Sequence, residues 1–474
     1  IYEEKNPGYF LNIGETLSKK YLILNISDHE TNEIYLLNKN GEDKNLFLFC
    51  KRKKGIEYSV DHDLEKSRFI ILNNNDKAID FKISFVEEKK IQAGYEKYPK
   101  KNWRDLIKHK KGVLITDFAD LKEFLIIQEL KDGLPRIKFI NKKNNKKTEI
   151  KFDEKAYQLN FNEGAEYASN LIRVNYSAMN VPATVYQYNL KTEKRKKLKQ
   201  QKIPAGFNKN KYETKRVFAK SHDGKKIPIS ILKLKTTKNN APTLLYGYGS
   251  YGMSMTPSFS VARLSLVDRG MVFAIAHIRG GMEKGRQWYL DGKLRKKKNT
   301  FKDFIKSAKF LKNSKISGDL TIHGGSAGGL LIGSTINMAP KLFKSAVADV
   351  PFVDVLNTIL DASLPLTPPE WEEWGNPILN KNDFLNIQSY SPYDNVRKQE
   401  YPSLLVTAGL TDPRVTYWEA AKWVARLRAL KTDKNDIFLK TNMDAGHAGK
   451  AGRYHQIDET AFIYSFILNS HNLL

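Results

Sequence analysis

The sequence predicts a chain of two parts, an all-β region over residues 1–210 followed by a doubly wound α/β domain over residues 211–474. Two observations predict this division. Short strand-like runs recur in the first part with a period near fifty residues, whereas strand-like and helix-like segments alternate in the second. The boundary lies near Asn210, where the first pattern gives way to the second.

The repeat in the first part predicts the blades of a β-propeller. Each unit carries a run of apolar, β-branched and aromatic residues, and turns rich in Asn, Asp, Gly and Lys separate the runs. The matching positions are Leu22, Phe69, Phe124 and Leu171, which lie 47, 55 and 47 residues apart. This period is typical of propeller blades, with a generic all-β domain as the alternative. About four blades can be counted.

The second part alternates between two kinds of segment. The apolar runs at 243–246 and 271–276 have the length and composition of buried strands. The segments 301–311, 417–430 and 458–468 carry apolar residues at helical spacing. Such alternation predicts a sheet of mostly parallel strands covered by helices.

A glycine-rich turn in this domain contains a candidate nucleophile, Ser326. The run Gly324–Gly328 has the form G-x-S-x-G, with a strand pattern before it at 319–323 and a small, apolar helix pattern after it at 327–338. In a strand-turn-helix of this kind the serine has a strained backbone and its hydroxyl is exposed above the sheet. The alternative is a structural strand-helix corner, because the short motif alone is weak evidence.

Two later residues complete a catalytic triad in the order Ser, Asp, His. Asp412 follows the strand-like run 403–407, and His447 follows the run 437–440 on a loop where glycines flank it. Taken alone, Asp412 could be a turn former and His447 a loop residue. Together the three predict an α/β-hydrolase with Ser326 as nucleophile, His447 as general base and Asp412 as the group that orients the imidazole.

Six segments carry recognisable patterns, two of them around Ser326 and His447. They are 245–252, 277–281, 324–329, 370–377, 390–396 and 445–447. Jointly they resemble the prolyl oligopeptidase family, and within it the oligopeptidase B branch. The resemblance implies a serine endopeptidase that cuts short peptides on the C-terminal side of Arg or Lys through an acyl-enzyme. It also implies a propeller that covers the active site and excludes folded proteins.

The resemblance implies seven blades, whereas about four can be counted here, and the chain starts at Ile1 and not at Met. We therefore expect that an N-terminal segment with early blades is missing. Oligopeptidase B enzymes often have acidic residues where this chain has Thr256 and Ser258. Those acidic residues favour substrates with a second basic residue next to the first. A preference for paired basic residues is therefore left open.

The resemblance also extends the predicted site. The backbone N–H of Ala327 is the first predicted oxyanion donor from the elbow geometry, and Tyr248 matches the family tyrosine that acts as the second. Arg414 matches an arginine that holds the bound peptide. Glu370 and Glu372 match carboxylates that recognise the basic side chain, a role that suits anionic partners of a guanidinium. The alternatives are packing for Tyr248, a surface salt bridge for Arg414 and an exposed acidic loop for the two glutamates.

Two tryptophans flank these glutamates. Trp371 and Trp374 predict aromatic walls for a slot that takes a cation on a long apolar stem. Three alternative functions stay open. They are cleavage after proline, cleavage of acylated peptides, and a non-catalytic propeller scaffold that binds polyanions.

Composition limits the remaining classes. The formal charge of +27 comes from Lys-rich, Asn-rich loops such as 194–199 and 296–298, which we expect to be solvated. Nucleic-acid binding is disfavoured because no basic stripe interleaves with aromatic residues. The nine histidines show no metal-ligand spacing, so neither a metal nor a cofactor is expected. Cys50 is the only cysteine, and no stretch approaches the length of a membrane span. These features favour a cytoplasmic location without a membrane partner, although a signal peptide stays possible.

Overall fold

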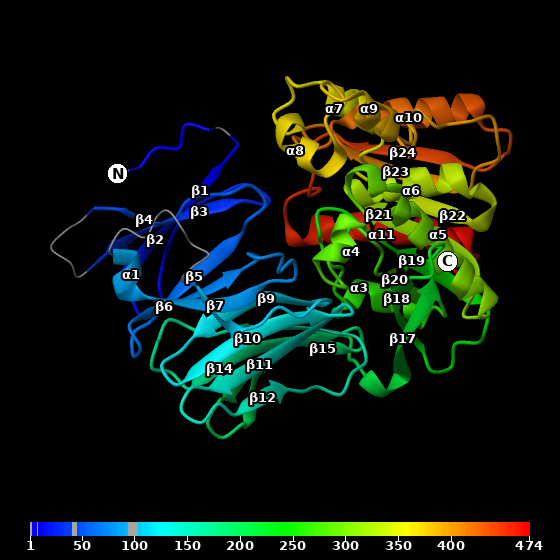
Figure 1. The fold of residues 1–474 in the computed structure, drawn as a ribbon. Coiled ribbons are helices and arrows are strands. Elements are labelled where there is room, and N and C mark those ends of the chain that lie inside the picture. Colours follow the sequence, from blue (N-terminus) through cyan, green and yellow to red (C-terminus); the bar gives the residue numbers. More distant parts are fainter. Residues whose placement is uncertain (1, 7, 40–44, 93–102) are drawn as a thin grey trace.

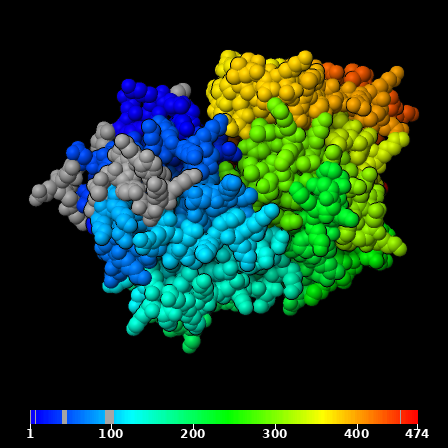
Figure 2. Space-filling view, in the orientation of Figure 1, coloured from blue at the N-terminus to red at the C-terminus, as the bar shows by residue number. Residues whose placement is uncertain are grey.

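The computed structural model describes residues 2–6, 8–39, 45–92 and 103–474. Figure 1 shows two parts side by side, a set of small twisted sheets in blue and cyan and a helix-covered sheet in green to red. In the space-filling view the two parts meet along a continuous boundary (Figure 2).

The first part consists of four sheets of four strands, each a simple antiparallel meander. The first sheet is β1 (Phe10–Glu15), β2 (Tyr21–Ser27), β3 (Asn32–Asn38) and β4 (Phe47–Cys50), and the second is β5 (Tyr58–Asp63), β6 (Arg68–Asn73), β7 (Lys82–Glu87) and β8 (Arg104–Ile107). The third is β9 (Val113–Asp120), β10 (Phe124–Lys131), β11 (Leu134–Asn141) and β12 (Lys147–Ile150), and the fourth is β13 (Tyr157–Asn162), β14 (Leu171–Ala178), β15 (Val181–Asn189) and β16 (Arg195–Gln200). A short helix, α1 (Glu88–Gln92), follows β7.

The predicted period is confirmed, because the four matching positions fall in the second strand of each sheet: β2, β6, β10 and β14. Strand β6 shows why these runs are apolar throughout. Phe69 and Ile71 pack in a cluster with residues of the first sheet, whereas Ile70 and Leu72 pack in a cluster with residues of the third. Since alternate side chains of a strand point to opposite faces, a sheet between two others buries both faces. This stacking is the packing of propeller blades.

The second part is built on one eight-stranded sheet. Its strands lie in the order β17-β18-β20-β19-β21-β22-β23-β24. They are β17 (Tyr212–Lys220), β18 (Lys226–Leu234), β19 (Ala241–Tyr246), β20 (Val272–Ala276), β21 (Ser317–Gly325), β22 (Ser345–Asp349), β23 (Ser403–Gly409) and β24 (Ile437–Asn442). Strands β17, β18 and β20 pair antiparallel, and the pairs from β20 through β24 are parallel. The predicted α/β architecture is confirmed.

Helices cover this sheet (Figure 1). They are α3 (Val261–Asp268), α4 (Arg286–Leu290), α5 (Lys298–Asn313), α6 (Ala327–Met338), α7 (Val355–Leu360), α8 (Thr367–Trp374), α9 (Lys381–Gln388), α10 (Tyr417–Leu430) and α11 (Arg453–Ser470). Short 3-10 turns lie at η1 (Lys209–Lys211), η2 (Leu294–Lys296) and η3 (Pro340–Leu342). Within the described ranges, no helix combines the length and apolar character needed to cross a bilayer.

The strand order reverses between β19 and β21, since β20 lies on one side of β19 and β21 on the other. In open α/β sheets, ligands bind beyond the carboxyl ends of the strands at such a switch point. The segments that leave β19 and β21 carry Tyr248 and Ser326. The topology thus brings together two residues that lie far apart in the sequence.

Two expectations about lysine runs need correction. Residues 194–199 do not form a loop, because Arg195–Gln200 is the edge strand β16. Its lysines are exposed, and charged side chains on an edge strand oppose pairing with other chains. In the run 296–298, Lys297 is only 1% exposed, so it is not a solvated surface lysine.

Candidate active site

Ser326 stands at a sharp turn between β21 and α6. Its φ of 56° and ψ of −121° are strained for a residue with a side chain. The turn is held because the Ser326 N–H donates to the Asp349 carbonyl at 2.8 Å and the Ser326 carbonyl accepts from the Gly329 N–H at 2.8 Å. A Cβ at Gly324 would lie 2.5 Å from the Gly328 carbonyl oxygen, so the motif glycine is needed for the close approach. The backbone is that of a nucleophile elbow.

Asp412 and His447 are joined by a hydrogen bond. His447 Nδ1 lies 2.7 Å from Asp412 Oδ2, while Asp412 Oδ1 accepts the backbone N–H groups of Arg414 at 2.8 Å and Val415 at 3.0 Å. Burial raises the pKa of Asp412, but the hydrogen bonds from His447, Val415 and Arg414 outweigh it and hold this pKa below its ordinary value. Asp412 is therefore an ionised carboxylate at neutral pH, as the orienting member of a triad must be.

Ser326, Asp412 and His447 follow β21, β23 and β24, whose carboxyl ends lie at the same edge of the sheet. The Ser326 hydroxyl has no hydrogen bond with the His447 ring in this structure, where both residues are described, and Tyr248 is instead a hydrogen-bond partner of the serine side chain. Catalytic hydrogen bonds often tighten only when substrate binds. The roles of the three residues stay a prediction.

Two predicted oxyanion donors lie beside Ser326. Ala327 is the first residue of α6, so its N–H has no intrahelical acceptor. Tyr248 packs partly against the core of the α/β domain, and burial raises the pKa of its phenol to about 12. The phenol therefore keeps its proton at neutral pH and can donate a hydrogen bond.

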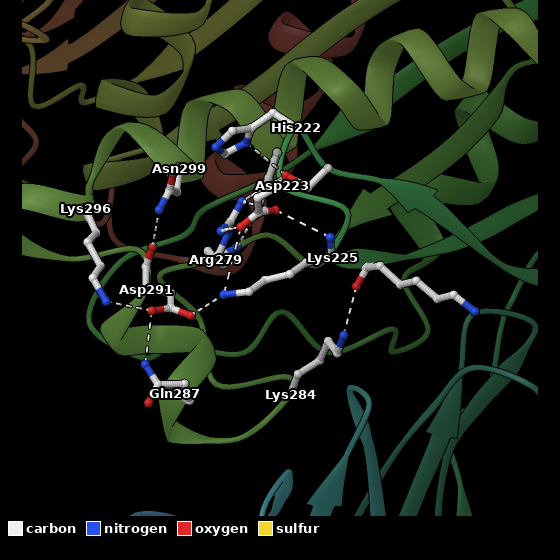
Figure 3. Close-up of polar contacts among 12 residues, drawn as sticks. His222, Asp223, Lys225, Arg279, Lys284, Gln287, Asp291, Lys296 and Asn299 are labelled. Atoms are coloured by element: carbon white, nitrogen blue, oxygen red, sulfur yellow. Dashed lines mark hydrogen bonds and ion pairs between the residues drawn. The ribbon is translucent and has the colours of Figure 1, made fainter.

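The turn around Tyr248 is pressed against the loop 277–281. A Cβ on Gly280, whose φ is +95°, would lie 1.8 Å from the Gly249 carbonyl oxygen, so only glycine fits there. Arg279, 1% exposed, fixes this loop through Asp303 at 2.6 Å and Asp223 at 2.6 Å. Figure 3 shows Arg279 beside Asp223 and Lys225, with Asp291 held by Lys225, Lys296 and Gln287 nearby. Arg279 thus holds the loop against which the Tyr248 turn packs.

The segment 370–374 lies in helix α8 and is not an exposed loop. Glu370 Oε2 accepts the Tyr251 hydroxyl and the Trp374 indole N–H, each at 2.7 Å. Glu370 Oε1 has no hydrogen-bond partner among the described residues. Glu370 thus has one oxygen fixed by the protein and one available.

Glu370 lines a cavity between the two parts of the chain. The lining residues are His29 and Glu57 from the propeller and Tyr251, Met282, Arg286, Tyr289, Pro369, Glu370 and Glu373 from the α/β domain. Three carboxylates thus face the cavity, and Arg286 pairs with one of them, Glu57. This local excess of negative charge contrasts with the charge of +27 for the whole chain.

Other predicted residues lie outside this cavity. Glu372 is exposed and pairs with Lys54 of the propeller at 3.2 Å. Trp374 is fully buried, and the Trp371 indole N–H donates to the Ile359 carbonyl at 3.1 Å. The expectation that these tryptophans form the walls is therefore wrong. Arg414 is exposed and makes no ion pair with any residue that the structure describes, so the surface salt bridge considered for it is absent there.

Sequence reasoning missed Glu373, which is 4% exposed and lines the cavity. It accepts the Tyr289 hydroxyl at 2.7 Å and the Tyr251 N–H at 3.2 Å. A signal was available, because in a helix Glu373 lies one turn after Glu370 and shares its face. The relation was missed because the segment was not assigned to a helix.

Comparison with known proteins covers both parts. The sequence model described as "Prolyl oligopeptidase, N-terminal beta-propeller domain" matches residues 1–201, and that of the "Prolyl oligopeptidase family" matches residues 257–473. The chain is 40% identical to dipeptidyl aminopeptidase BI of Pseudoxanthomonas mexicana, over 99% of this chain and 64% of the relative. It is 37% identical to protease 2 of Moraxella lacunata, over 99% of this chain and 66% of the relative. It therefore spans just under two thirds of the length of these curated relatives.

A solved structure gives the same result. Oligopeptidase B from Trypanosoma brucei, in a closed form with covalently bound antipain, superposes with a TM-score of 0.91 at 38% identity, over 99% of this chain and 67% of that one. The four-stranded sheets, the eight-stranded sheet and the serine elbow agree with these matches. The chain belongs to the prolyl oligopeptidase family.

Proposed function

We propose that this chain is a serine oligopeptidase that cleaves short peptides on the C-terminal side of Arg or Lys. The observation that carries the proposal is the position of Glu370, which lines an acidic cavity beside the turn that bears Tyr248 and has one carboxylate oxygen without a hydrogen-bond partner among the described residues. An arginine side chain needs such a carboxylate, because a desolvated guanidinium is stabilised by charge-assisted hydrogen bonds. The boundary near Asn210 is part of the proposal, supported by the end of β16 at Gln200 and the start of β17 at Tyr212.

The proposed reaction begins at Ser326. His447 accepts the serine proton as Oγ attacks the carbonyl carbon, while Asp412 holds the imidazole and stabilises the imidazolium. The resulting oxyanion accepts hydrogen bonds from the Ala327 N–H and the Tyr248 hydroxyl. The C–N bond then breaks, His447 gives its proton to the leaving amine, and the acyl group stays on Ser326. Water, deprotonated by His447, hydrolyses this ester and restores the serine.

Substrate binding is proposed to use one residue of the cavity and two residues outside it. Glu370 binds the basic side chain directly, and Glu372 adds negative charge on the exposed surface, where Lys54 partly neutralises it. Arg414 is proposed to hold the peptide backbone, which its exposed guanidinium allows because it makes no ion pair with the residues described. Short basic peptides are therefore the proposed substrates.

A cytoplasmic location is kept in the proposal because Cys50 is a buried free thiol.

A second candidate is removal of dipeptides from a free N-terminus. The similarity to the dipeptidyl aminopeptidase of Pseudoxanthomonas mexicana favours it. The same carboxylates that bind a guanidinium could bind a terminal ammonium group. Two reporters with Arg before the cleaved bond, one with a free dipeptide and one with a blocked N-terminus, separate the candidates. Cleavage of the blocked peptide supports endopeptidase activity.

Replacing Glu370 by glutamine should weaken selection of basic residues. The substitution keeps the shape and an acceptor for Trp374 but removes the charge, so kcat/KM for an Arg reporter should fall about 100-fold. Glu372→Gln should reduce it only about threefold, as expected of an exposed charge. Glu400→Gln is the matched control, since Glu400 is exposed and pairs with Lys341 at 3.3 Å. An Arg reporter cleaved equally well by Glu370→Gln would refute the assignment.

Replacing Tyr248 by phenylalanine should lower kcat about 100-fold to 1000-fold, because one oxyanion donor is lost. KM should change little, since the carbonyl is bound weakly before attack. Tyr186→Phe, in strand β15 of the propeller, is the control. Steady-state kinetics with the Arg reporter measure both constants. A fall confined to KM would show that Tyr248 binds the peptide and does not stabilise the oxyanion.

A further inference from the structure

Lys297 is a buried lysine that the proposed reaction does not use. It lies directly before helix α5 and is 1% exposed, although its neighbour Lys296 is largely exposed. Its ammonium group lies 4.8 Å from the centre of the Trp374 ring. Burial lowers the pKa of Lys297 to about 8, with the charge of Glu373 opposing that shift. A lysine so far from water needs specific partners.

The partners of Lys297 lie in the turn that follows Tyr248. Its Nζ donates to the Gly249 carbonyl and to Ser250 Oγ, each at 2.7 Å. Gly249 has a φ of +78° and Tyr251 a φ of 57°, so this turn contains left-handed positions, one of them at a residue with a side chain. Strained backbone of this kind persists only where the surroundings fix it. Lys297 supplies two of the fixing hydrogen bonds.

Glu373 completes the arrangement from helix α8. Its Oε1 lies 3.8 Å from Lys297 Nζ and accepts the Tyr251 N–H at 3.2 Å. Tyr251 in turn donates its hydroxyl to Glu370 at 2.7 Å. Lys297 thus binds Gly249 and Ser250, and Glu373 binds Tyr251, so buried charged side chains hold three successive residues of the turn after Tyr248. Glu373 belongs to helix α8, which also carries Glu370.

We propose that Lys297 and Glu373 are a positioning pair that ties the turn bearing Tyr248 to helix α8. Through this pair the oxyanion donor and the acidic pocket keep one fixed geometry. Neither residue touches the reacting atoms. The inference rests on the roles proposed above for Ser326 and Tyr248.

The test compares Lys297→Met with the neighbouring control Lys296→Met. A double variant, Lys297→Met with Glu373→Gln, leaves no unpaired buried charge and guards against loss of folding. Because a small displacement of a catalytic donor costs about 100-fold, both Lys297 variants should lower kcat for the Arg reporter by that order. KM of Lys297→Met should stay within about threefold, since Glu370 and Glu373 both remain in place. A merely structural role would not separate kcat from KM in this way.

Two readouts do not require peptide cleavage. The rate at which a fluorophosphonate labels Ser326 should fall with kcat, and hydrogen exchange of the amides at 248–252 should rise about tenfold or more while that of β21 is unchanged. If the fluorophosphonate labels the unmodified chain but the chain cuts no Arg peptide, the proposed function fails, and the labelling rates of the variants still test the positioning pair. If the unmodified chain is not labelled, hydrogen exchange of the variants tests the positioning pair. Labelling and exchange in the folded Lys297 variants equal to those of Lys296→Met would overturn the inference.

Discussion

Ser326→Ala should abolish turnover of Arg peptides, with a fall in kcat of about a millionfold. Ser326 is the residue at the turn between β21 and α6, and its backbone angles place its hydroxyl beside Tyr248 and Ala327. No other described side chain takes this position. Without the hydroxyl no acyl-enzyme forms. Stopped assays with the Arg reporter measure the loss, and a fluorophosphonate probe should label the unmodified chain only.

The control for Ser326→Ala is its melting temperature. Alanine removes one oxygen from a half-buried side chain, so unfolding should shift by no more than a few degrees. The strained backbone is fixed by the hydrogen bonds of the peptide groups to Asp349 and Gly329, which alanine keeps. Residual labelling or turnover in a folded Ser326→Ala protein would mean that another residue is the nucleophile.

Asp412→Asn should lower kcat about ten-thousandfold, the second largest effect expected. The carboxylate accepts from His447 Nδ1, which leaves the other ring nitrogen free to take the serine proton. An amide at this position can donate to Nδ1 and so favour the wrong tautomer. The remaining amide oxygen can still accept the N–H groups of Arg414 and Val415, so folding should be preserved.

Asp433→Asn is a matched control for this variant. Asp433 also accepts a backbone N–H, that of Tyr401 at 2.7 Å, and lies on the loop between α10 and β24, away from the histidine. Its replacement should leave kcat within about twofold, as is usual for changes away from the site. A similar loss in both variants would indicate a general effect on the domain and would contradict the role of Asp412.

Much of the fold was predictable because local patterns decide it. The helix predicted over 327–338 is α6 with the same limits, and the helix predicted over 417–430 is α10. The propeller period was visible because the second strand of each sheet carries an apolar run, which in β6 is buried on both faces. The order of Ser326, Asp412 and His447 followed from the order of the strands.

The errors concern residues whose partners are distant in the chain. Lys297 belonged to a run of lysines, and nothing local shows that its amine meets Gly249 and Ser250. Glu373 was missed and Trp374 was misplaced because burial depends on which face of α8 meets the core. The sequence also did not predict that His29 and Glu57 of the propeller line the cavity, because this cavity forms only where the two parts of the chain meet.

The overall charge and the local charge have opposite signs in this protein. The chain carries +27, yet three carboxylates line the cavity at Glu57, Glu370 and Glu373. Long-range repulsion between exposed charges is screened beyond about 8 Å at physiological salt, whereas a buried pair is screened much less. Under the proposed function, the local carboxylates therefore decide which side chain binds, and the net charge affects mainly the rate of approach.

The most direct measurement is turnover of two blocked chromogenic peptides, one with Arg and one with Pro before the reporter, by the unmodified chain. We expect cleavage of the Arg peptide with a kcat/KM at least about 100-fold above that of the Pro peptide, given the charge-assisted contact at Glu370. Equal cleavage of both, or preference for Pro, would contradict an acidic pocket for basic residues. Cleavage of neither, with no labelling of Ser326, would contradict a serine peptidase in this chain.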